Sequence, residues 1–443
     1  MKRVVSVGFM VMVALTPVFA GGQGDAGAGE GPLELTFWTS HTPPDSITLA
    51  EMVDEYNASQ QAVRVEMVQV PGSETDVAQL MTAVRGGTGP DIYMLDRFTV
   101  AQRAAAGVLE DLTEVMEAVD PALPDSYISY AWQETQFQGR TYALPFDTDA
   151  RVLYYNRRMI AEAGIDPAIL DPANGPITLE QAREIARAID RTDDDGNYTQ
   201  VGFIPYDIQF SQGWHYTWGF NFGGRFADLE AGRVTPTDPG VVAGFEFMRD
   251  WAADMDPQRV QTFISTYAPP NTPTQQNAFL TERVAMKVSG DWVLKWLDQY
   301  TPDLDYGVTY IPVPTADEEP STWAGGWALV VPTGSDHVEE AFEFMRWFAG
   351  EAGQRMYTEG TAHLPTYERL MNDDALFEGD HEFFRASLAF AESRPPLPVG
   401  ALYWDALTRA LSSVTLQQED PATVLQQVAD EVQPQLDQFL PLQ

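Results

Sequence analysis

The residues with the clearest chemical potential are two aspartates and a phenylalanine in the segment Tyr142–Asn156, which reads YALPFDTDARVLYYN. Strand-like runs flank a break that opens at Pro145, where sheet pairing should end because proline lacks a ladder donor. The break carries Phe146, Asp147 and Asp149. Carboxylate acceptors beside an aromatic ring suit a polyhydroxylated ligand, whose hydroxyls donate and whose C–H faces stack. The alternative is that both aspartates are turn residues that bind their own backbone.

The same residue types would also suit the active site of a glycosidase, because such a site needs two carboxylates and often several aromatic rings. Asp147 and Asp149 lie two apart on an extended segment and could share one face. Nothing in the sequence identifies either carboxyl group as an acid with a raised pKa. Other enzyme classes have less support, since the chain has no Gly-x-Ser-x-Gly elbow, no cysteine, and five histidines that never pair at metal-ligand spacing. We therefore expect no catalytic residue, no metal and no cofactor.

The elements that must position a ligand begin near the N-terminus with the order strand, helix, strand, helix, strand. This order runs from Leu33–Trp38 through 63–70 to Asp91–Leu95, and it predicts parallel pairing with right-handed crossovers. In such sheets ligands bind outside the carboxyl ends of the strands. The strand ends and the loops that follow them supply the candidates Trp38, Ser40, His41, Gly72, Ser73, Asp96 and Arg97.

Later segments add aromatic candidates. The segment Gly213–Gly224 crowds aromatics between glycines without helical spacing, so its rings could line a cleft or fill a core. Asp291 is expected to cap a helix that leaves Trp292 at its entrance as a stacking group. The run WAGGW at 323–327 lets a ligand approach the backbone while a ring packs on it, the alternative being a bulge with core tryptophans. The candidates from these segments are Trp214, Trp218, Asn221, Asp291, Trp292, Trp323, Gly325, Gly326 and Trp327. The segment that begins at Ser393 adds Arg394 and Tyr403.

Two local patterns predict secondary structure with a clear mechanism. Thr178 and Gln181 form a capping box at the start of a helix. The run Asp193–Asn197 (DDDGN) looks superficially like a calcium loop, but the ligand positions counted from Gly196 fall on wrong residue types. A hairpin turn is the better interpretation.

The net charge and the N-terminal targeting segment constrain the possible partners and the location of the protein. The 443 residues include 26 basic and 65 acidic residues, for a net charge of −39, so nucleic acid is an unfavourable partner. A salty habitat is one hypothesis for this acidity. Lys2 and Arg3 precede a short apolar run and a small-residue site, which predicts a secretory signal peptide (1–20) cleaved after Ala20, the alternative being a retained anchor. A flexible leader (21–31) follows, and we expect no membrane insertion after cleavage.

With these residues in view, the chain resembles the family 1 extracellular solute-binding proteins of ABC importers, the maltose-binding-protein-like class. The resemblance extends from Leu33 to about Leu440, and six segments carry it in the family's order. They are LTFW (35–38), GTGPDIYMLD (87–96), YALPFDTDARVLYYNRRMIAEAGIDP (142–167), VAMKVSGDW (284–292), YGVTYIPVP (306–314) and WAGGWALVVPTGS (323–335).

The resemblance implies a two-lobed α/β fold of the periplasmic-binding-protein type, each lobe a mainly parallel sheet flanked by helices, with hinge crossings between them. By that analogy the first lobe takes 32–144 and 310–358, and the second takes 145–309 and 359–443. Residue by residue, it suggests the ligand contacts Asp96, Asp147, Asp149, Trp323, Gly325, Gly326 and, more loosely, Arg394.

The function implied by the resemblance is capture of a sugar or short oligosaccharide by a monomer, which then delivers it to ABC permease subunits. A chemoreceptor partner with no transport role is an alternative. Many relatives carry an N-terminal lipid-anchored cysteine. This chain has no cysteine, so we expect it to diffuse freely in a periplasm.

Overall fold

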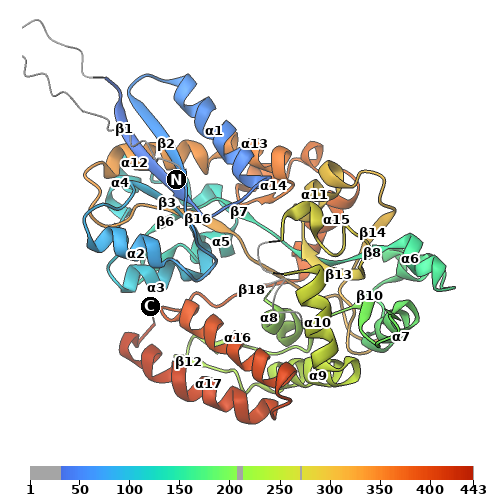
Figure 1. Ribbon diagram of the computed structural model, residues 1–443. Helices are drawn as coiled ribbons and strands as arrows, with labels where there is room; N and C mark the ends of the chain where they lie inside the picture. The colour runs from blue at the N-terminus through green and yellow to red at the C-terminus, as the bar shows by residue number, and fades with distance from the viewer. Residues whose placement is uncertain (1–30, 207–212, 270–271, 443) are drawn as a thin grey trace, which may run out of the picture.

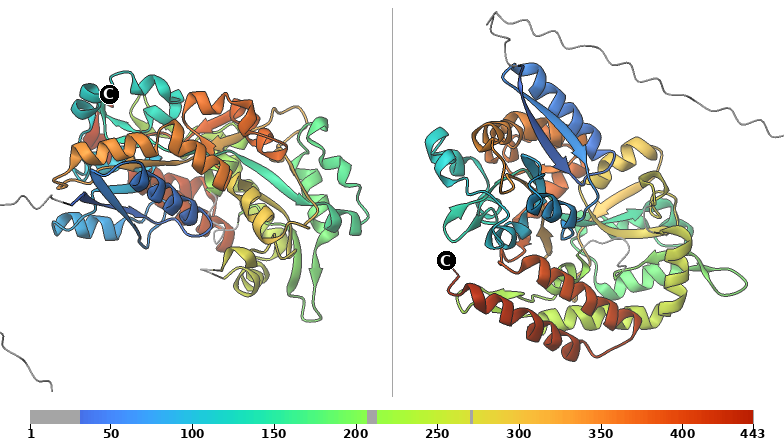
Figure 2. Two further views of the ribbon diagram at one scale, coloured as in Figure 1. Left: turned by 90° about the horizontal axis from the view of Figure 1, so that it is seen from above. Right: turned by 60° about the vertical axis from the view of Figure 1, so that its left-hand side comes forward.

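The computed structural model describes residues 31–206, 213–269 and 272–442. The predicted signal peptide (1–20) and the predicted leader, apart from its last residue, lie outside the described residues. Two five-stranded sheets organise the described chain, and helices pack around each of them to give two lobes (Figures 1 and 2). The predicted two-lobed α/β architecture is therefore present.

The sheet of the first lobe has the strand order β2-β1-β3-β16-β6. Its strands are β1 (Leu33–Thr39), β2 (Val63–Gln69), β3 (Ile92–Asp96), β6 (Ala143–Pro145) and β16 (Trp327–Val330). Side chains alternate along a strand, so Ile92 and Met94 enter one apolar cluster while Tyr93 and Leu95 enter another. Helices therefore cover both faces of this sheet, as the fully buried strand β3 predicts.

The helices of the first lobe come from both ends of the chain, and α1 and α13 lie against each other on one face (Figure 1). They are α1 (Asp45–Ser59), α2 (Ala78–Arg85), α3 (Val100–Ala105), α4 (Thr113–Val119), α5 (Ser129–Gln133), α12 (Val338–Phe348) and α13 (Glu351–Thr361). A small hairpin joins β4 (Gln136–Phe137) to β5 (Arg140–Thr141).

The sheet of the second lobe has the order β14-β8-β13-β10-β9. Its strands are β8 (Arg151–Asn156), β9 (Arg191–Thr192), β10 (Tyr198–Phe203), β13 (Val284–Gly290) and β14 (Tyr306–Thr309), with a separate hairpin of β11 (Ala227–Asp228) and β12 (Arg233–Val234). The helices are α6 (Arg157–Glu162), α7 (Leu179–Ile189), α8 (Trp214–Asn221), α9 (Pro239–Met255), α10 (Pro257–Tyr267), α11 (Trp292–Tyr300), α14 (Glu368–Met371), α15 (Asp380–Ser387), α16 (Gly400–Leu416) and α17 (Pro421–Leu436).

Both sheets are mixed, which corrects the expectation of mainly parallel sheets. Pairing is parallel between β1 and β2, between β1 and β3, and between β10 and β13. The strands that enter after a crossing between the lobes run antiparallel to their neighbours, as β16 does against β3 and β8 does against β13. Parallel pairing was predicted from the residues for the first three strands, where crossover helices dictate it, and there it is confirmed. The mainly parallel sheet of each lobe was implied by the family resemblance.

Two short ladders lie where the chain passes between the lobes. The strand β7 (Asp147–Thr148) pairs with β17 (Leu364–Pro365), and β15 (Thr322–Ala324) pairs with β18 (Ala391–Ser393). The polypeptide therefore crosses at several points, and residues near 147, 324, 364 and 393 are held side by side.

Two expected lobe boundaries need correction. Pro145 belongs to β6 and Phe146 packs in the core of the first lobe, so the first segment of that lobe extends past 144. Ile311 packs in the core of the second lobe, and the backbone of Val313 exchanges hydrogen bonds with Ile177 and Leu179 at 2.9 and 2.8 Å. The segment after β14 therefore stays with the second lobe beyond residue 310, because its apolar side chains face the helix α7 rather than the first sheet.

The predicted turn and capping box are confirmed. Asp193 and Asn197 close the hairpin between β9 and β10 through a 2.9 Å backbone bond. Thr178 accepts a hydrogen bond from the Gln181 amide at 3.2 Å, and the Gln181 side chain accepts one from the Thr178 amide at 2.8 Å. Among the described residues, no helix is both long and apolar enough to cross a membrane.

Removing the cap should weaken the start of α7. The substitution Thr178→Ala is expected to lower the free energy of unfolding by about 1 kcal/mol, because the Gln181 amide loses its acceptor. Urea unfolding followed by circular dichroism measures the change. Thr178→Ser keeps the hydroxyl and should stay close to wild type. Equal losses in the two variants would contradict the capping role.

Candidate functional site

A cavity of about 200 Å³ lies between the two lobes. The first lobe contributes the loop after β1, the loop after β2 and the end of β3, while the second lobe contributes the start of β8, the helix α11 and the first turns of α16. The lining residues are His41, Thr42, Asp45, Glu74, Asp96, Asp149, Arg151, Trp292, Trp296, Trp323, Gly326, Trp327, His363, Arg394 and Trp404.

Two carboxylate–guanidinium pairs lie in the cavity wall. Asp96, at the end of β3, receives Nη2 and Nη1 of Arg394 at 2.7 and 3.3 Å. Asp149 pairs with Arg151 and also accepts a hydrogen bond from the Gly325 amide at 2.7 Å. Charge-assisted pairs of this kind are strong and directional. They hold acceptor oxygens at fixed positions while cancelling most of their charge.

Tryptophan rings form the apolar part of the wall. The Arg151 guanidinium lies 3.5 Å from the Trp323 ring centroid, and the Arg394 guanidinium lies 5.2 Å from the same ring. The Trp323 indole donates from Nε1 to the Thr217 hydroxyl at 2.9 Å. This ring is thus fixed by cation–π contacts and one hydrogen bond. Trp292 and Trp296, one turn apart on α11, present a second aromatic surface.

A buried cluster of charges adjoins the cavity. His363 Nδ1 lies 3.4 Å from Asp291 Oδ1 and 3.6 Å from Asp147 Oδ2, and its Nε2 lies 3.8 Å from Asp45 Oδ2. Burial raises the pKa of Asp147 to about 7, although the His363 charge opposes this shift. Burial would lower the pKa of His363, but Asp45, Asp147 and Asp291 together raise it to about 10. Burial also raises the pKa of Asp291 well above its usual range.

This cluster predicts a pH dependence of stability. The Asp147 carboxyl binds its proton more tightly in the folded protein (pKa about 7) than in the unfolded chain, where carboxyl groups titrate near about 4. Its contribution to stability is therefore complete below about pH 4 and is lost as the pH rises through about 7, a change on the order of 4 kcal/mol. Chemical unfolding at intervals between pH 4 and pH 8 measures it.

Asp147→Asn is the matched variant, because an asparagine oxygen can still accept the Trp327 amide, which lies 2.6 Å from Asp147 Oδ1. The free energy of unfolding of wild type should fall more steeply between pH 4 and pH 7 than that of Asp147→Asn. Parallel curves for the two proteins would show that Asp147 does not carry the expected proton.

The structure brings eight of the sequence candidates together around the cavity. They come from six separate segments, which supports the expectation that strand ends and the glycine-rich WAGGW segment meet. They are His41, Asp96, Asp149, Trp292, Trp323, Gly326, Trp327 and Arg394. Gly325 adjoins them through its amide bond to Asp149. Their role as ligand contacts remains a prediction.

Several candidates have structural roles away from the cavity. Arg97 is fully buried and donates to Glu134 and to the carbonyl oxygens of Asp147 and Gly325. Phe146 packs on Phe348 in the core of the first lobe. Asp147 faces His363 rather than the cavity.

Other candidates lie in a lobe core or in a loop outside the cavity wall. Trp214, Trp218 and Asn221 are buried in α8, so the aromatic segment is core rather than cleft. The Tyr403 hydroxyl donates to the Phe226 carbonyl at 3.0 Å within the second lobe. The remaining candidates outside the cavity wall are Trp38, a half-buried residue packed on the first lobe, the half-buried Ser40, and the exposed loop residues Gly72 and Ser73.

Asp291 is at the predicted helix start, but its side chain makes no capping bond. It turns toward His363 instead. The capping interpretation was therefore right about position and wrong about the side chain, because a buried imidazole on another segment competes for the carboxylate.

Seven lining residues were missed by sequence reasoning: Thr42, Asp45, Glu74, Arg151, Trp296, His363 and Trp404. Two of them had a usable signal. Arg151 follows Asp149 by two residues on an extended segment, and Trp296 follows Trp292 by four residues on a helix, so each pair shares a face. His363 had no local signal, because its neighbours in space come from distant segments.

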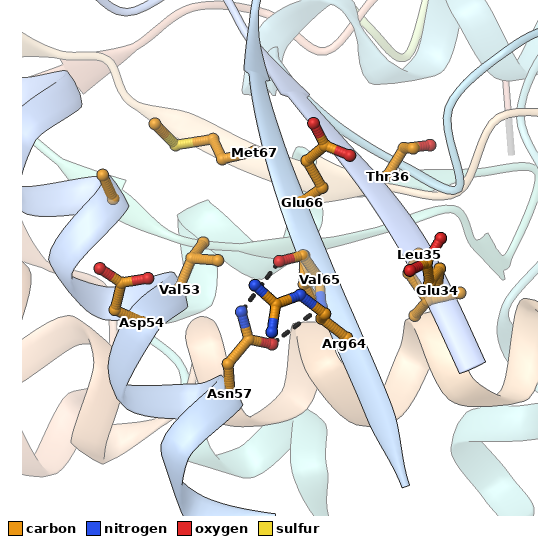
Figure 3. A pocket seen from close by; sticks show the side chains of 11 residues that line it. Glu34, Leu35, Thr36, Val53, Asp54, Asn57, Arg64, Val65, Glu66 and Met67 are labelled. Carbon is orange, nitrogen blue, oxygen red and sulfur yellow. Dashed lines mark hydrogen bonds between the residues drawn. The ribbon is translucent and has the colours of Figure 1, made fainter. Parts of the chain in front are cut away.

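A larger hollow, of about 530 Å³, lies on the outer side of the first lobe between α1 and β2 (Figure 3). Asn57 binds the backbone of Val65 there through bonds of 2.8 and 2.9 Å, and Arg64 and Glu66 point from the edge strand. No aromatic side chain is among its lining residues. We therefore place the candidate site in the smaller cavity. Within the described residues, no three His, Asp or Glu side chains gather as metal ligands would.

The sequence model of one family, described as "Bacterial extracellular solute-binding protein", matches residues 51–383. The chain belongs to this family. The predicted resemblance is confirmed, and the two-lobed fold is the architecture that similar structures share.

Two relatives show how far the similarity extends. The "Maltotriose-binding protein" of Pyrococcus abyssi is 21% identical over 396 residues, which cover 88% of this chain and 79% of that protein. The "Galactooligosaccharide-binding protein" of Bacillus subtilis is 23% identical over 412 residues, which cover 91% and 89%.

Solved structures agree on the fold. "CpMnBP1 with Mannobiose Bound" superposes with a TM-score of 0.78 at 21% identity, covering 90% of this chain and 99% of that one. The GacH receptor of Streptomyces glaucescens, solved unliganded and with acarbose, gives a TM-score of 0.72 at 22% identity, covering 92% and 99%. The family is extracellular and consists of binding proteins.

Proposed function

We propose that this protein captures a neutral saccharide between its two lobes, as the binding component of an ABC importer, and delivers it to the membrane permease. The observation that carries this proposal is a cavity in which Trp292 and Trp404 stand beside Asp96 and Asp149. Indole rings cover the C–H faces of a sugar, and carboxylates accept hydrogen bonds from its hydroxyls. Because each of these carboxylates already pairs with an arginine, the cavity favours an uncharged polyol over an anion.

The relatives support this substrate class. Two of them are named for maltotriose and for galactooligosaccharides, and similar structures hold mannobiose or acarbose. The proposal therefore extends from a monosaccharide to a short oligosaccharide.

Closure is the proposed mechanism. A sugar touches the Asp96 wall of the first lobe and the Trp292 wall of the second lobe only when the lobes are together, so it shifts the population toward the closed state. The proposed lobes are those expected from the sequence, except that the first segment of the first lobe runs to Phe146 and its second segment begins after Val313. The closed form would then dock on the permease, whereas docking on a chemoreceptor is the competing use of the same form.

A thermal-shift screen of mono- and oligosaccharides, followed by calorimetry, tests the proposal. A saccharide at about 100 times its Kd should stabilise the protein by about 2.7 kcal/mol. Glycerophosphodiesters, polyamines, peptides and metal chelates form the comparison arm, because one similar structure holds glycerophosphocholine. Stabilisation only in that arm would overturn the saccharide assignment.

We also propose that the protein is not an enzyme and that it is exported. Any bound oligosaccharide should be recovered unchanged after prolonged incubation. Release of reducing ends that stops in Asp149→Asn would instead establish a glycosidase. Mass spectrometry of the protein from its native envelope should find a chain that starts at Gly21, and a start at Met1 would contradict cleavage after Ala20.

A further inference from the structure

His363 lies at a crossing between the lobes. It follows α13, which packs in the first lobe, and directly precedes β17, which pairs with β7. Its side chain is buried, yet it forms part of the cavity wall. No local sequence pattern explains a histidine here, so its neighbours in space must.

Each lobe places one aromatic ring on the His363 imidazole. On one side is Tyr357 of α13 in the first lobe, with ring centroids 5.3 Å apart and an interplanar angle of 11°. On the other side is Trp292 at the start of α11 in the second lobe, at 5.5 Å and 28°. Stacked geometries at these separations are favourable. The imidazole is therefore in ring contact with one residue of the first lobe and one of the second.

Each lobe also places a carboxylate at the imidazole edge. Asp45 in the first turn of α1 belongs to the first lobe and lies 3.8 Å from Nε2, while Asp291 of the second lobe lies 3.4 Å from Nδ1. Both oxygens of Asp291 and Oδ2 of Asp147 have no hydrogen-bond partner among the described residues. A buried carboxyl group without such a partner stays neutral unless a cation lies nearby. His363 is the cation that these carboxyl groups surround.

The other titratable groups around His363 do not replace it. Burial lowers the pKa of His41, in the loop after β1, to about 4, and it lowers the pKa of His381, on α15, to about 4 as well. The Tyr357 phenol is kept neutral because burial raises its pKa well above the usual value. Arg151 of β8 also acts on Asp291, but it pairs directly with Asp149. At neutral pH, His363 is thus the charged imidazole of the cluster.

We propose that His363 is a positioning residue that joins the first lobe to the second in the closed state and holds the Trp292 ring at the wall of the ligand cavity. Asp291 and Trp292 are adjacent, so seating the Asp291 carboxylate on the imidazole also orients the indole. Opening the lobes would separate Asp45 and Tyr357 from Asp291 and Trp292, so the imidazole could not keep both sets of contacts. The inference rests on the proposed function, because it assigns to closure a contact that the ligand does not make.

The primary test compares His363→Gln with His337→Gln, a control at the start of α12 on the first lobe, away from the cavity. Calorimetry should show that His363→Gln weakens every saccharide that binds by a similar factor, about 10- to 100-fold, whereas His337→Gln changes nothing. A similar factor for all ligands distinguishes a closure contact from a direct contact, which would discriminate among sugars. X-ray scattering should show a more open His363→Gln protein, both without ligand and at a fixed sugar concentration.

Asp45→Asn is the second variant and guards against a folding defect, since the Asp45 side chain is partly exposed at 17%. This substitution should also weaken binding. The double variant Asp45→Asn with His363→Gln should have a Kd no higher than that of the weaker-binding single variant, because both substitutions remove the same interaction between Asp45 and His363. Unchanged affinity and unchanged scattering in both single variants would overturn the proposal.

Failure of the proposed function has a different signature. If no saccharide binds wild type, the function fails, and the role of His363 is then decided by scattering of the ligand-free proteins alone. Wild type should be more compact than His363→Gln without ligand. Identical scattering profiles of the two proteins would overturn the proposed role of His363.

Discussion

Replacing Arg97 by methionine should lower the free energy of unfolding by about 3 to 5 kcal/mol, because it leaves a buried charge without its partner. Arg97 is fully buried, and its Nε donates to Glu134 Oε2 at 2.5 Å. Its Nη2 donates to the Gly325 carbonyl at 2.7 Å, and its Nη1 donates to the Asp147 carbonyl. One side chain thus joins the end of β3, the end of α5 and two crossings between the lobes.

The measurement is urea unfolding followed in parallel by circular dichroism and tryptophan fluorescence. The double variant Arg97→Met with Glu134→Gln is the control, because it removes both charges. It should be more stable than Arg97→Met alone, although it still lacks the two bonds to backbone carbonyls. If Arg97→Met unfolds within about 0.5 kcal/mol of wild type, Arg97 does not have the structural role assigned to it.

Arg97 also shows what sequence reasoning could and could not predict. Its position at the end of β3 followed from a local pattern of strand and loop residues, and that position is correct. Whether its side chain points to a ligand or to the protein depends on Glu134 and on two carbonyl groups from segments far away in the chain. Asp96, one residue earlier, points into the cavity and pairs with Arg394.

The same limit applies to the aromatic residues. The crowding of Trp214 and Trp218 between glycines was compatible with a cleft or a core. These rings lie in the core because α9 and α16 pack against α8. Trp292 was correctly placed at a helix entrance, because helical spacing separated it from the buried face of α11. Local periodicity predicts which face a residue occupies, whereas the segment that covers that face is set by tertiary packing.

Trp292→Ala should have the largest effect on ligand affinity. The indole lines the cavity, stacks on His363 and lies 5.5 Å from the Arg151 guanidinium. Its removal takes away the stacking surface for a sugar ring and one of the two rings that hold the imidazole. A loss of about 2 to 3 kcal/mol of binding free energy, or about 30- to 150-fold in Kd, is expected. Isothermal titration calorimetry with a saccharide identified by the thermal screen measures it.

Two matched variants separate the possible causes. Trp347→Ala removes a half-buried tryptophan from α12 of the first lobe, away from the cavity, and should leave Kd unchanged. Trp292→Phe keeps a ring that can stack on both the sugar and His363, so it should lose less than Trp292→Ala. Thermal unfolding of all three checks that they fold. If Trp292→Ala binds the sugar as tightly as wild type, the α11 wall does not contact the ligand, and the site must be sought along the Trp323 and Trp404 wall instead.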